Sequence, residues 1–128
     1  MSEKKIVGVT GANGFLGNAI MAQMNSSEIK CIGLVRSDVK GNPNYRKIGD
    51  LTSNFNARVL NGIDVLVHCA GNANAFEDKD LEEINVTAPL RLVEAASKEG
   101  VKRFIFISSA KVNGEKTARG KFFTENSK

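Results

Sequence analysis

The sequence predicts an α/β fold, a doubly wound parallel sheet with helices on both faces. Short, nearly continuous apolar runs alternate along the chain with segments in which apolar residues recur at helical spacing. Apolar runs without polar alternation are typical of strands buried on both faces, as strands are in parallel sheets. Because crossovers between such strands are right-handed, we expect the strand order 3-2-1-4-5.

The first strand and helix flank a glycine-rich turn. Residues 6–9 (IVGV) form the first predicted strand, which leads into a turn with glycines at positions 11, 14 and 17. Beyond the turn, one stripe of a predicted helix carries Leu16, Ala19, Ile20 and Met24. The glycines therefore lie between a buried strand and the start of a helix.

The middle of the chain continues the alternation. Predicted strands cover residues 31–35, 45–48 and 65–69, and a loop rich in Gly, Pro and Asn separates the first two. A helix is expected before the last of these strands, begun by Thr52 or Ser53 and ended by Gly62. Its apolar residues are Phe55, Val59 and Leu60.

The longest predicted helix covers residues 80–99, and the fifth strand follows at 104–107. Pro89 should kink or locally break this helix, because proline has no N–H for the helical ladder. One face of the helix carries Leu81, Ile84, Ala88, Leu92 and Ala95, and Gly100 should end it. From Ala110 onward the chain is polar and is expected to be loop.

Composition restricts the classes of partner and compartment. The 128 residues suffice for one domain with a core, and the net charge is +4. The basic residues are scattered and aromatic residues make up only 6%, which does not favour a nucleic-acid partner. The N-terminus matches neither a signal peptide nor a membrane span. We therefore expect a cytoplasmic protein with no membrane partner.

The cysteines and the single histidine do not predict a metal site. Cys31 and Cys69 lie in apolar runs, which is typical of free, buried thiols in a reducing compartment. Together with His68 they are too few for metal ligation. His68 also lies within the fourth strand, which favours a packed or backbone-bonded histidine over a catalytic base.

The glycine pattern predicts a cradle for a pyrophosphate. In a doubly wound sheet, ligands bind beyond the carboxyl ends of the strands, beside the first strand. There Gly11 would make the tight turn, Gly14 would admit the pyrophosphate, and Gly17 would let the helix pack close to the sheet. The N–H groups and the positive end of the helix would face the phosphates. The sequence has no Gly-Lys-Ser/Thr, which excludes a P-loop.

The segment 10–17 (TGANGFLG) resembles the nucleotide loop of the extended short-chain dehydrogenase/reductase family. That family has a Rossmann fold and includes nucleotide-sugar epimerases, dehydratases and reductases. Four later segments resemble it in the right order, so that the resemblance covers essentially the whole chain: residues 49–51, residues 68–71, Asn85 and residues 106–114. The implied cofactor-binding residues are Gly11, Asn13, Gly14, Phe15, Leu16, Gly17, Arg36, Asp50, Leu51, Cys69, Ala70, Gly71, Asn85 and Ser108.

The resemblance also implies catalytic residues. The family's catalytic serine or threonine maps onto Ser109, whose hydroxyl would hydrogen-bond the reacting oxygen of the substrate, and Ser108 is the weaker candidate. Asn113 stands where the motif commonly has tyrosine, which leaves the substrate contacts there open. The family further needs a tyrosine acid/base with a lysine four residues later. This chain has one tyrosine, Tyr45, and position 49 is glycine.

We therefore expect residues 1–128 to be the N-terminal, dinucleotide-binding part of a longer enzyme, truncated after the fifth strand. The parent would be a nucleotide-sugar epimerase, dehydratase or 4-keto-reductase, and the sequence leaves open which of these and which sugar. Alone, the chain is expected to bind a dinucleotide without turning over substrate. The alternatives are a non-catalytic NAD(P)H-binding sensor module and an atypical NAD(P)H reductase. The resemblance is compatible with a homodimer, because extended family members often dimerise through the fourth and fifth helices.

The end of the second predicted strand bears on the choice of cofactor. An acidic residue there would bind the ribose 2′-OH and repel a 2′-phosphate, but this chain has Arg36 followed by Ser37. The guanidinium offers a planar, charged fork suited to phosphate. The sequence therefore favours NADP(H), with NAD(H) as the alternative if Arg36 stacks on the adenine or reaches solvent.

Overall fold

The protein folds around one parallel sheet, as the sequence predicts. The computed structural model describes residues 3–26, 28–71, 78–109, 114 and 116–127. The strand order is β3-β2-β1-β4-β5, and every neighbouring pair is parallel. The elements in chain order are β1 (Lys5–Thr10), α1 (Phe15–Met24), β2 (Ile29–Val35), β3 (Tyr45–Lys47), the 3₁₀-helix η1 (Ala57–Leu60), β4 (Val65–His68), α2 (Asp78–Glu82), the π-helix η2 (Glu83–Thr87), α3 (Ala88–Lys98) and β5 (Arg103–Phe106).

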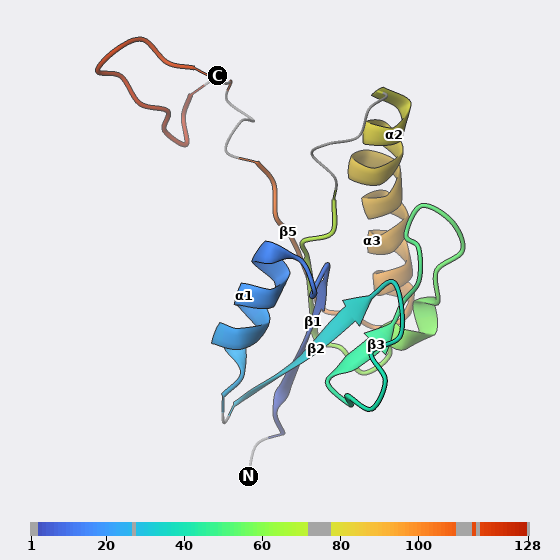
Figure 1. Cartoon of the computed structure of the whole chain (residues 1–128). Coiled ribbons are helices and arrows are strands. Elements are labelled where there is room, and N and C mark those ends of the chain that lie inside the picture. The colour runs from blue at the N-terminus through green and yellow to red at the C-terminus, as the bar shows by residue number, and fades with distance from the viewer. Residues whose placement is uncertain (1–2, 27, 72–77, 110–113, 115, 128) are drawn as a thin grey trace.

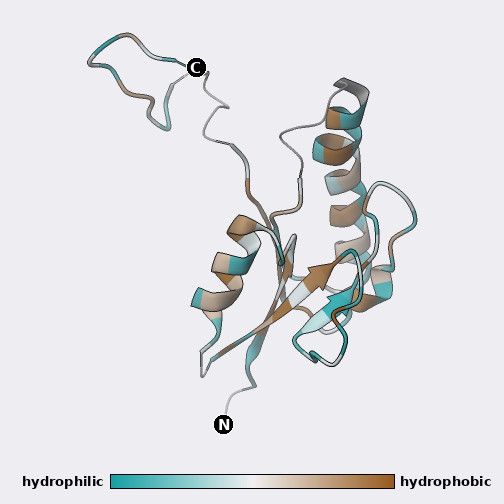
Figure 2. Cartoon of the chain, in the orientation of Figure 1, coloured by the Kyte–Doolittle hydropathy of each residue, from teal (hydrophilic) through white to brown (hydrophobic). Residues whose placement is uncertain are grey.

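Helices cover both faces of the sheet, with α1 on one side and α3 on the other (Figure 1). On the α3 side, Leu66 of β4 packs with Leu92 and Ala96 in one buried cluster. On the α1 side, Val9 of β1 and Met21 belong to a second buried cluster. Figure 2 shows hydrophobic residues along β2 and hydrophilic residues on β3 and the loop beside it. The two buried clusters therefore lie against the central strands, one on each face of the sheet.

Two predicted helices differ from the observed elements. No helix begins at Thr52 or Ser53; a turn occupies this segment instead, and the 3₁₀-helix η1 begins later, where Asn56 caps it through a bond from the N–H of Arg58. In α1 the buried residues are Gly17 and Met21. Of the predicted stripe, Ile20 and Met24 are half-buried against the same cluster, whereas Leu16 and Ala19 are exposed. The ten-residue helix α1 contacts β1 and β2, so only the narrow face that it turns toward these strands is buried.

Pro89 has the expected effect on the long helix, through a specific local geometry. The segment 78–98 is helical, but η2 separates α2 from α3, and Pro89 lies in the first turn of α3. The N–H of Ala88 bonds to the carbonyl of Glu83, five residues back. Because proline has no N–H to donate, widening one turn removes the conflict with the carbonyl four residues before it.

The sole tyrosine is a packing residue. Tyr45 begins β3 opposite Gly33 of β2, and a Cβ on Gly33 would lie 2.5 Å from the tyrosine ring. Glycine in this strand therefore makes room for the ring. Tyr45 is half-buried against the cluster on the α1 side of the sheet, which accounts for its side chain without a catalytic role.

The edge strand β5 and the neighbouring face of α3 leave apolar side chains exposed. Phe106 is half exposed, and Leu90 and Val93 of α3 are exposed near it along a shallow apolar groove. Among the described residues, no helix is long and apolar enough to cross a membrane.

The α3 helix offers a matched pair of leucines for testing the core. Leu92 is fully buried in the cluster on its side of the sheet, whereas Leu90 is 66% exposed. We expect Leu92→Ala to lower the free energy of unfolding by about 3 kcal/mol, because it removes buried methyl groups and leaves a cavity. Leu90→Ala should change it by less than about 0.5 kcal/mol. Urea denaturation measures both, and equal losses would contradict this packing of α3.

Candidate functional site

The glycine turn after β1 packs closely against backbone, both its own and that of the segment after β4. Gly11 has a φ of +63°, and a Cβ on it would lie 3.0 Å from the backbone nitrogen of Ala70. A Cβ on Gly17 would overlap the carbonyl group of Gly11. The sequence predicts that Gly17 lets the helix approach the sheet, but the nearest neighbours of Gly17 are Gly11 and Ala12 in the turn itself. Both positions therefore require glycine for the turn to fold back on α1.

The N-terminus of α1 carries no side-chain cap. Gly14 is the N-cap residue; it makes no side-chain bond, and the first turn of the helix contains no acidic residue. The N–H groups of a first helical turn have no partner within the helix, and the helix dipole adds positive potential there. This end of α1 is therefore suited to an anion.

A buried polar cluster joins the carboxyl ends of β1 and β4. The Oγ1 of Thr10 accepts hydrogen bonds from the N–H groups of Cys69 (3.1 Å) and Ala70 (3.2 Å). It lies 2.7 Å from Nδ1 of His68. Because the hydroxyl already accepts two hydrogen bonds, its proton goes to Nδ1, and the neutral ring carries its own proton on Nε2. This cluster sets the start of the glycine turn beside residues 69–71.

His68 is a packed residue, as predicted. It is 1% exposed, and its ring lies 6.0 Å from that of Phe104 and 5.8 Å from that of Phe106. Its Nε2 is buried without a hydrogen-bond partner in the described part of the chain. Burial lowers the pKa of His68 to about 4, because desolvation penalises the charged ring. The ring is therefore neutral at physiological pH and is held as a hydrogen-bond acceptor.

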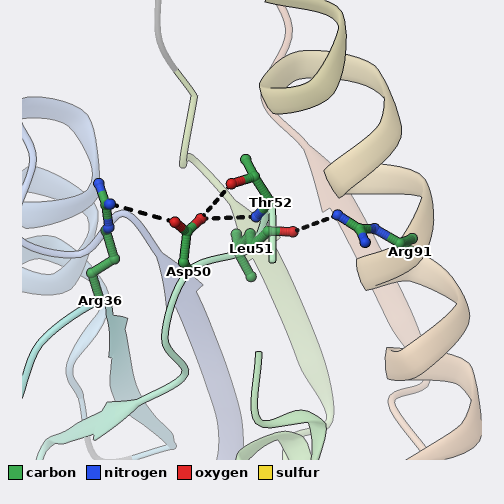
Figure 3. A network of polar contacts seen from close by, with 5 residues as sticks. All are labelled: Arg36, Asp50, Leu51, Thr52 and Arg91. Carbon is green, nitrogen blue, oxygen red and sulfur yellow. Dashed lines mark hydrogen bonds and ion pairs between the residues drawn. The ribbon is translucent and has the colours of Figure 1, made fainter. Parts of the chain in front are cut away.

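A charged network lies at the rim, where β2 and β3 end (Figure 3). Arg36 follows β2, and its Nη2 lies 3.5 Å from Oδ2 of Asp50. The other oxygen, Oδ1, accepts from the N–H (2.9 Å) and the hydroxyl (2.7 Å) of Thr52. From the opposite side, Arg91 of α3 donates to the carbonyl of Leu51 at 3.3 Å. The hydrogen bonds from Thr52, and less strongly the charge of Arg36, lower the pKa of Asp50.

These segments surround a cleft of about 340 Å³ at the carboxyl edge of the sheet. This volume falls at the lower end of the range for small-molecule sites. The lining comes from the ends of four strands and from the helical segment 84–88. The lining residues are Thr10, Gly11, Asn13, Leu34, Val35, Arg36, Ile48, Gly49, Asp50, Leu51, Thr52, Ala70, Gly71, Ile84 and Ala88.

The cleft brings together about half of the residues proposed from the sequence. Those that line it are Gly11, Asn13, Arg36, Asp50, Leu51, Ala70 and Gly71. Gly14, Phe15, Leu16 and Gly17 do not line it; Gly14 is the N-cap residue of α1, and the other three lie in its first turn. Asn85 lies close to Gly71, since a Cβ added to Gly71 would lie 3.0 Å from Oδ1 of Asn85. Ser108 and Ser109 are exposed beyond β5 and do not line the cleft, so their proposed roles stay predictions. Asn113 lies outside the described residues.

Sequence reasoning missed the positioning roles of two threonines. Thr10 is the last residue of β1 and directly precedes the glycine turn. It is a polar residue at the end of a buried strand, and buried polar side chains are generally hydrogen-bonded, which could have indicated its role. Thr52 was interpreted as a helix cap, but it completes a turn in which Asp50 accepts from the residue two positions later. The Asp-x-Thr pattern is typical of such turns and could have identified it.

Both cysteines are free, and burial raises the pKa of each thiol; Cys31 is buried and Cys69 half-buried. Over the ranges that the structure describes, no group of three His, Cys, Asp or Glu side chains could hold a metal ion.

Comparison with known proteins shows the family to which this chain is related. The model of the NAD dependent epimerase/dehydratase family matches residues 7–128. A UDP-glucose 4-epimerase of Vibrio cholerae is 35% identical over 128 residues, which span 91% of this chain but only 38% of that protein. The structure of MoeE5 in complex with UDP-glucose and NAD is 31% identical, with a TM-score of 0.70 over 84% of this chain and 38% of that one. An Agrobacterium tumefaciens short-chain dehydrogenase/reductase superfamily protein shares the fold, with a TM-score of 0.78 at 24% identity over 96% of this chain and 38% of that one.

The hydroxyl of Thr10 can be tested with isosteric and conservative variants. Thr10→Val leaves the N–H groups of Cys69 and Ala70 and the Nδ1 of His68 without this partner. We expect a loss of about 2–3 kcal/mol in the free energy of unfolding and faster amide exchange at residues 69 and 70. Thr10→Ser retains the hydroxyl and should keep the slow exchange. Equal exchange rates in the two variants would contradict the role of the hydroxyl.

The buried histidine predicts a loss of stability in mild acid. Its pKa is about 4 in the folded chain and 6.5 for the free side chain, so below pH 6.5 the unfolded chain takes up a proton that the folded chain does not. The free energy of unfolding should therefore fall by about 2 kcal/mol between pH 7 and pH 5. The pKa values of Asp50 and Asp64 are lowered from 3.8, so their contributions are lost only in stronger acid. His68→Gln removes the only histidine and should make the free energy of unfolding nearly constant between pH 7 and pH 5. A constant free energy of unfolding over this range in the native chain would refute the lowered pKa of His68.

Proposed function

The chain belongs to the NAD-dependent epimerase/dehydratase family, and from that premise we propose that it is the dinucleotide-binding part of an enzyme acting on a nucleotide sugar. The observation that carries the proposal is the cleft itself, because the glycine turn, the end of β2 and the segments after β3 and β4 all line it. In open α/β sheets, dinucleotides bind at this switch point beside the first strand.

The residues present fit a dinucleotide. The uncapped N-terminus of α1, with Gly14 at the N-cap and no acid in the first turn, suits the pyrophosphate. Arg36 at the end of β2 would meet the ribose, and Asp50 and Leu51 would contact the adenine. Ala70 and Gly71 would border the nicotinamide half. The positive charge of Arg36 favours NADP(H), while the relatives solved with NAD support NAD(H) as the other cofactor.

The proposed chemistry needs residues from two parts of the parent protein. A bound nicotinamide dinucleotide supplies acceptance and return of a hydride. In this chain, Ser109 would donate a hydrogen bond to the reacting oxygen of the sugar and stabilise charge there. The tyrosine and lysine that exchange the proton are absent from residues 1–128, since the sole tyrosine is Tyr45 on β3. We infer that they lie elsewhere in the parent, because the chain spans only 38% of the Vibrio cholerae relative. The chain alone should then bind a dinucleotide without turnover.

The absence of that pair from the chain also favours a second candidate, a non-catalytic NAD(P)H-binding module. Fluorescence titration with NADH and NADPH tests the binding that both candidates share, and no binding of either would refute both. The parent gene separates them. A Tyr-x-x-x-Lys motif within about 20–40 codons after Lys128 would support the enzyme, in which the pair sits on the helix that follows the fifth strand. Its absence there would support the module.

Arg36 provides the test of cofactor preference. Arg36→Gln should weaken NADPH binding about tenfold and leave NADH binding unchanged, because only NADPH carries the 2′-phosphate that a guanidinium binds. Arg58→Gln removes the same charge from η1, away from the cleft, and should change neither affinity. Equal weakening of both cofactors by Arg36→Gln, or a tenfold preference of the native chain for NADH, would contradict the role given to Arg36.

A further inference from the structure

The only ion-pair partner of Arg36 among the described residues is Asp50, which lines the same cleft. Resting on the proposed binding of a dinucleotide, we propose that Asp50 is a specificity-determining residue: by pairing with Arg36 it withholds the guanidinium from a 2′-phosphate and shifts preference from NADP(H) towards NAD(H). Asp50 acts through Arg36 and is therefore a positioning residue.

The geometry fixes the carboxylate more firmly than the arginine. Oδ1 of Asp50 accepts two hydrogen bonds from Thr52, which orients the carboxylate and leaves Oδ2 facing Arg36 at 3.5 Å. The side chain of Arg36 is 77% exposed and that of Asp50 42% exposed. The guanidinium therefore has room to turn away, whereas the carboxylate is held in place.

A carboxylate and a phosphate compete for the same donors. Both accept charge-assisted hydrogen bonds from the planar fork of an arginine. The residue at the end of β2 is the one that faces the ribose 2′ position in this class of sheet. To bind a 2′-phosphate there, Arg36 has to leave Asp50, so the ion pair between them is lost. NADH carries no 2′-phosphate, so its binding does not require this exchange.

The effect is expected to be modest. Exposed ion pairs contribute little, because water screens them and both side chains lose freedom. Loss of the pair should therefore change the ratio of the two affinities about threefold, on the scale typical of exposed pairs. Thermodynamic coupling of this size is measurable because NADH and NADPH share every other contact with the protein.

The central experiment measures both dissociation constants on Asp50→Asn by fluorescence titration. Asparagine keeps an oxygen for Thr52 but has no charge for Arg36. The ratio Kd(NADH)/Kd(NADPH) should rise about threefold over the native value. Any general weakening of adenine binding or partial unfolding affects both cofactors alike and cancels in the ratio. Asp50→Ser, which also lacks the carboxylate, should shift the ratio in the same direction.

Asp38→Asn is the matched control. Asp38 lies in the loop after β2, pairs with Lys47 at 3.8 Å and does not line the cleft. Its replacement removes the same charge and should leave the ratio unchanged. An equal shift from Asp38→Asn would mean that net charge, not the pair with Arg36, sets the ratio, and would overturn the inference.

A second background separates the pair from direct repulsion. When Arg36 is already glutamine, Asp50→Asn should change the ratio much less than in the native chain. An equal change in both backgrounds, or no change in the native chain, would overturn the inference while leaving dinucleotide binding intact. Failure of the native chain to bind either cofactor would instead refute the proposed function.

Discussion

The hydrogen bonds around the hydroxyl of Thr10 are the interaction on which the geometry of the cleft depends. β1 and β4 lie side by side at the centre of the sheet, and the chain leaves both strands at the same edge. The Oγ1 of Thr10 holds the first two N–H groups beyond β4, while its proton is held by His68. A buried donor or acceptor left without a partner costs stability. The end of β1 and the segment after β4 therefore cannot separate without lowering the free energy of unfolding.

The glycine turn extends this constraint to α1. Gly11 packs against Ala70, which positions the glycine turn relative to the end of β4. Gly17 packs against Gly11, which positions α1 relative to the turn. The uncapped N-terminus of α1 thus follows a turn whose backbone is packed against residue 70. Preorganised N–H groups bind an anion without first ordering a loop, which lowers the entropic cost of binding.

The buried strands were predictable from the sequence because apolar runs without alternation leave few other structures. All five strands and their order were correct. The helix predicted from Thr52 was wrong because Asp50 engages that threonine in a turn, and the composition of a helix cap and of a turn is the same. Glycine spacing located the cleft. It could not reveal the pair between Arg36 and Asp50, since that contact depends on the register of β2 with the three residues of β3.

The division between a neutral interior and a charged rim has a consequence for specificity. The contacts of Thr10, His68, Gly11 and Gly17 that build the cradle include neither Arg36 nor Asp50. Substitutions of Arg36 or Asp50 should therefore change the charge of the cleft without breaking the buried hydrogen bonds that join β1 and β4. Salt should act in the same selective manner, because exposed charges are screened while the buried hydrogen bonds are not. We therefore propose that the side chains of this exposed rim, and not the buried cradle, set the cofactor preference.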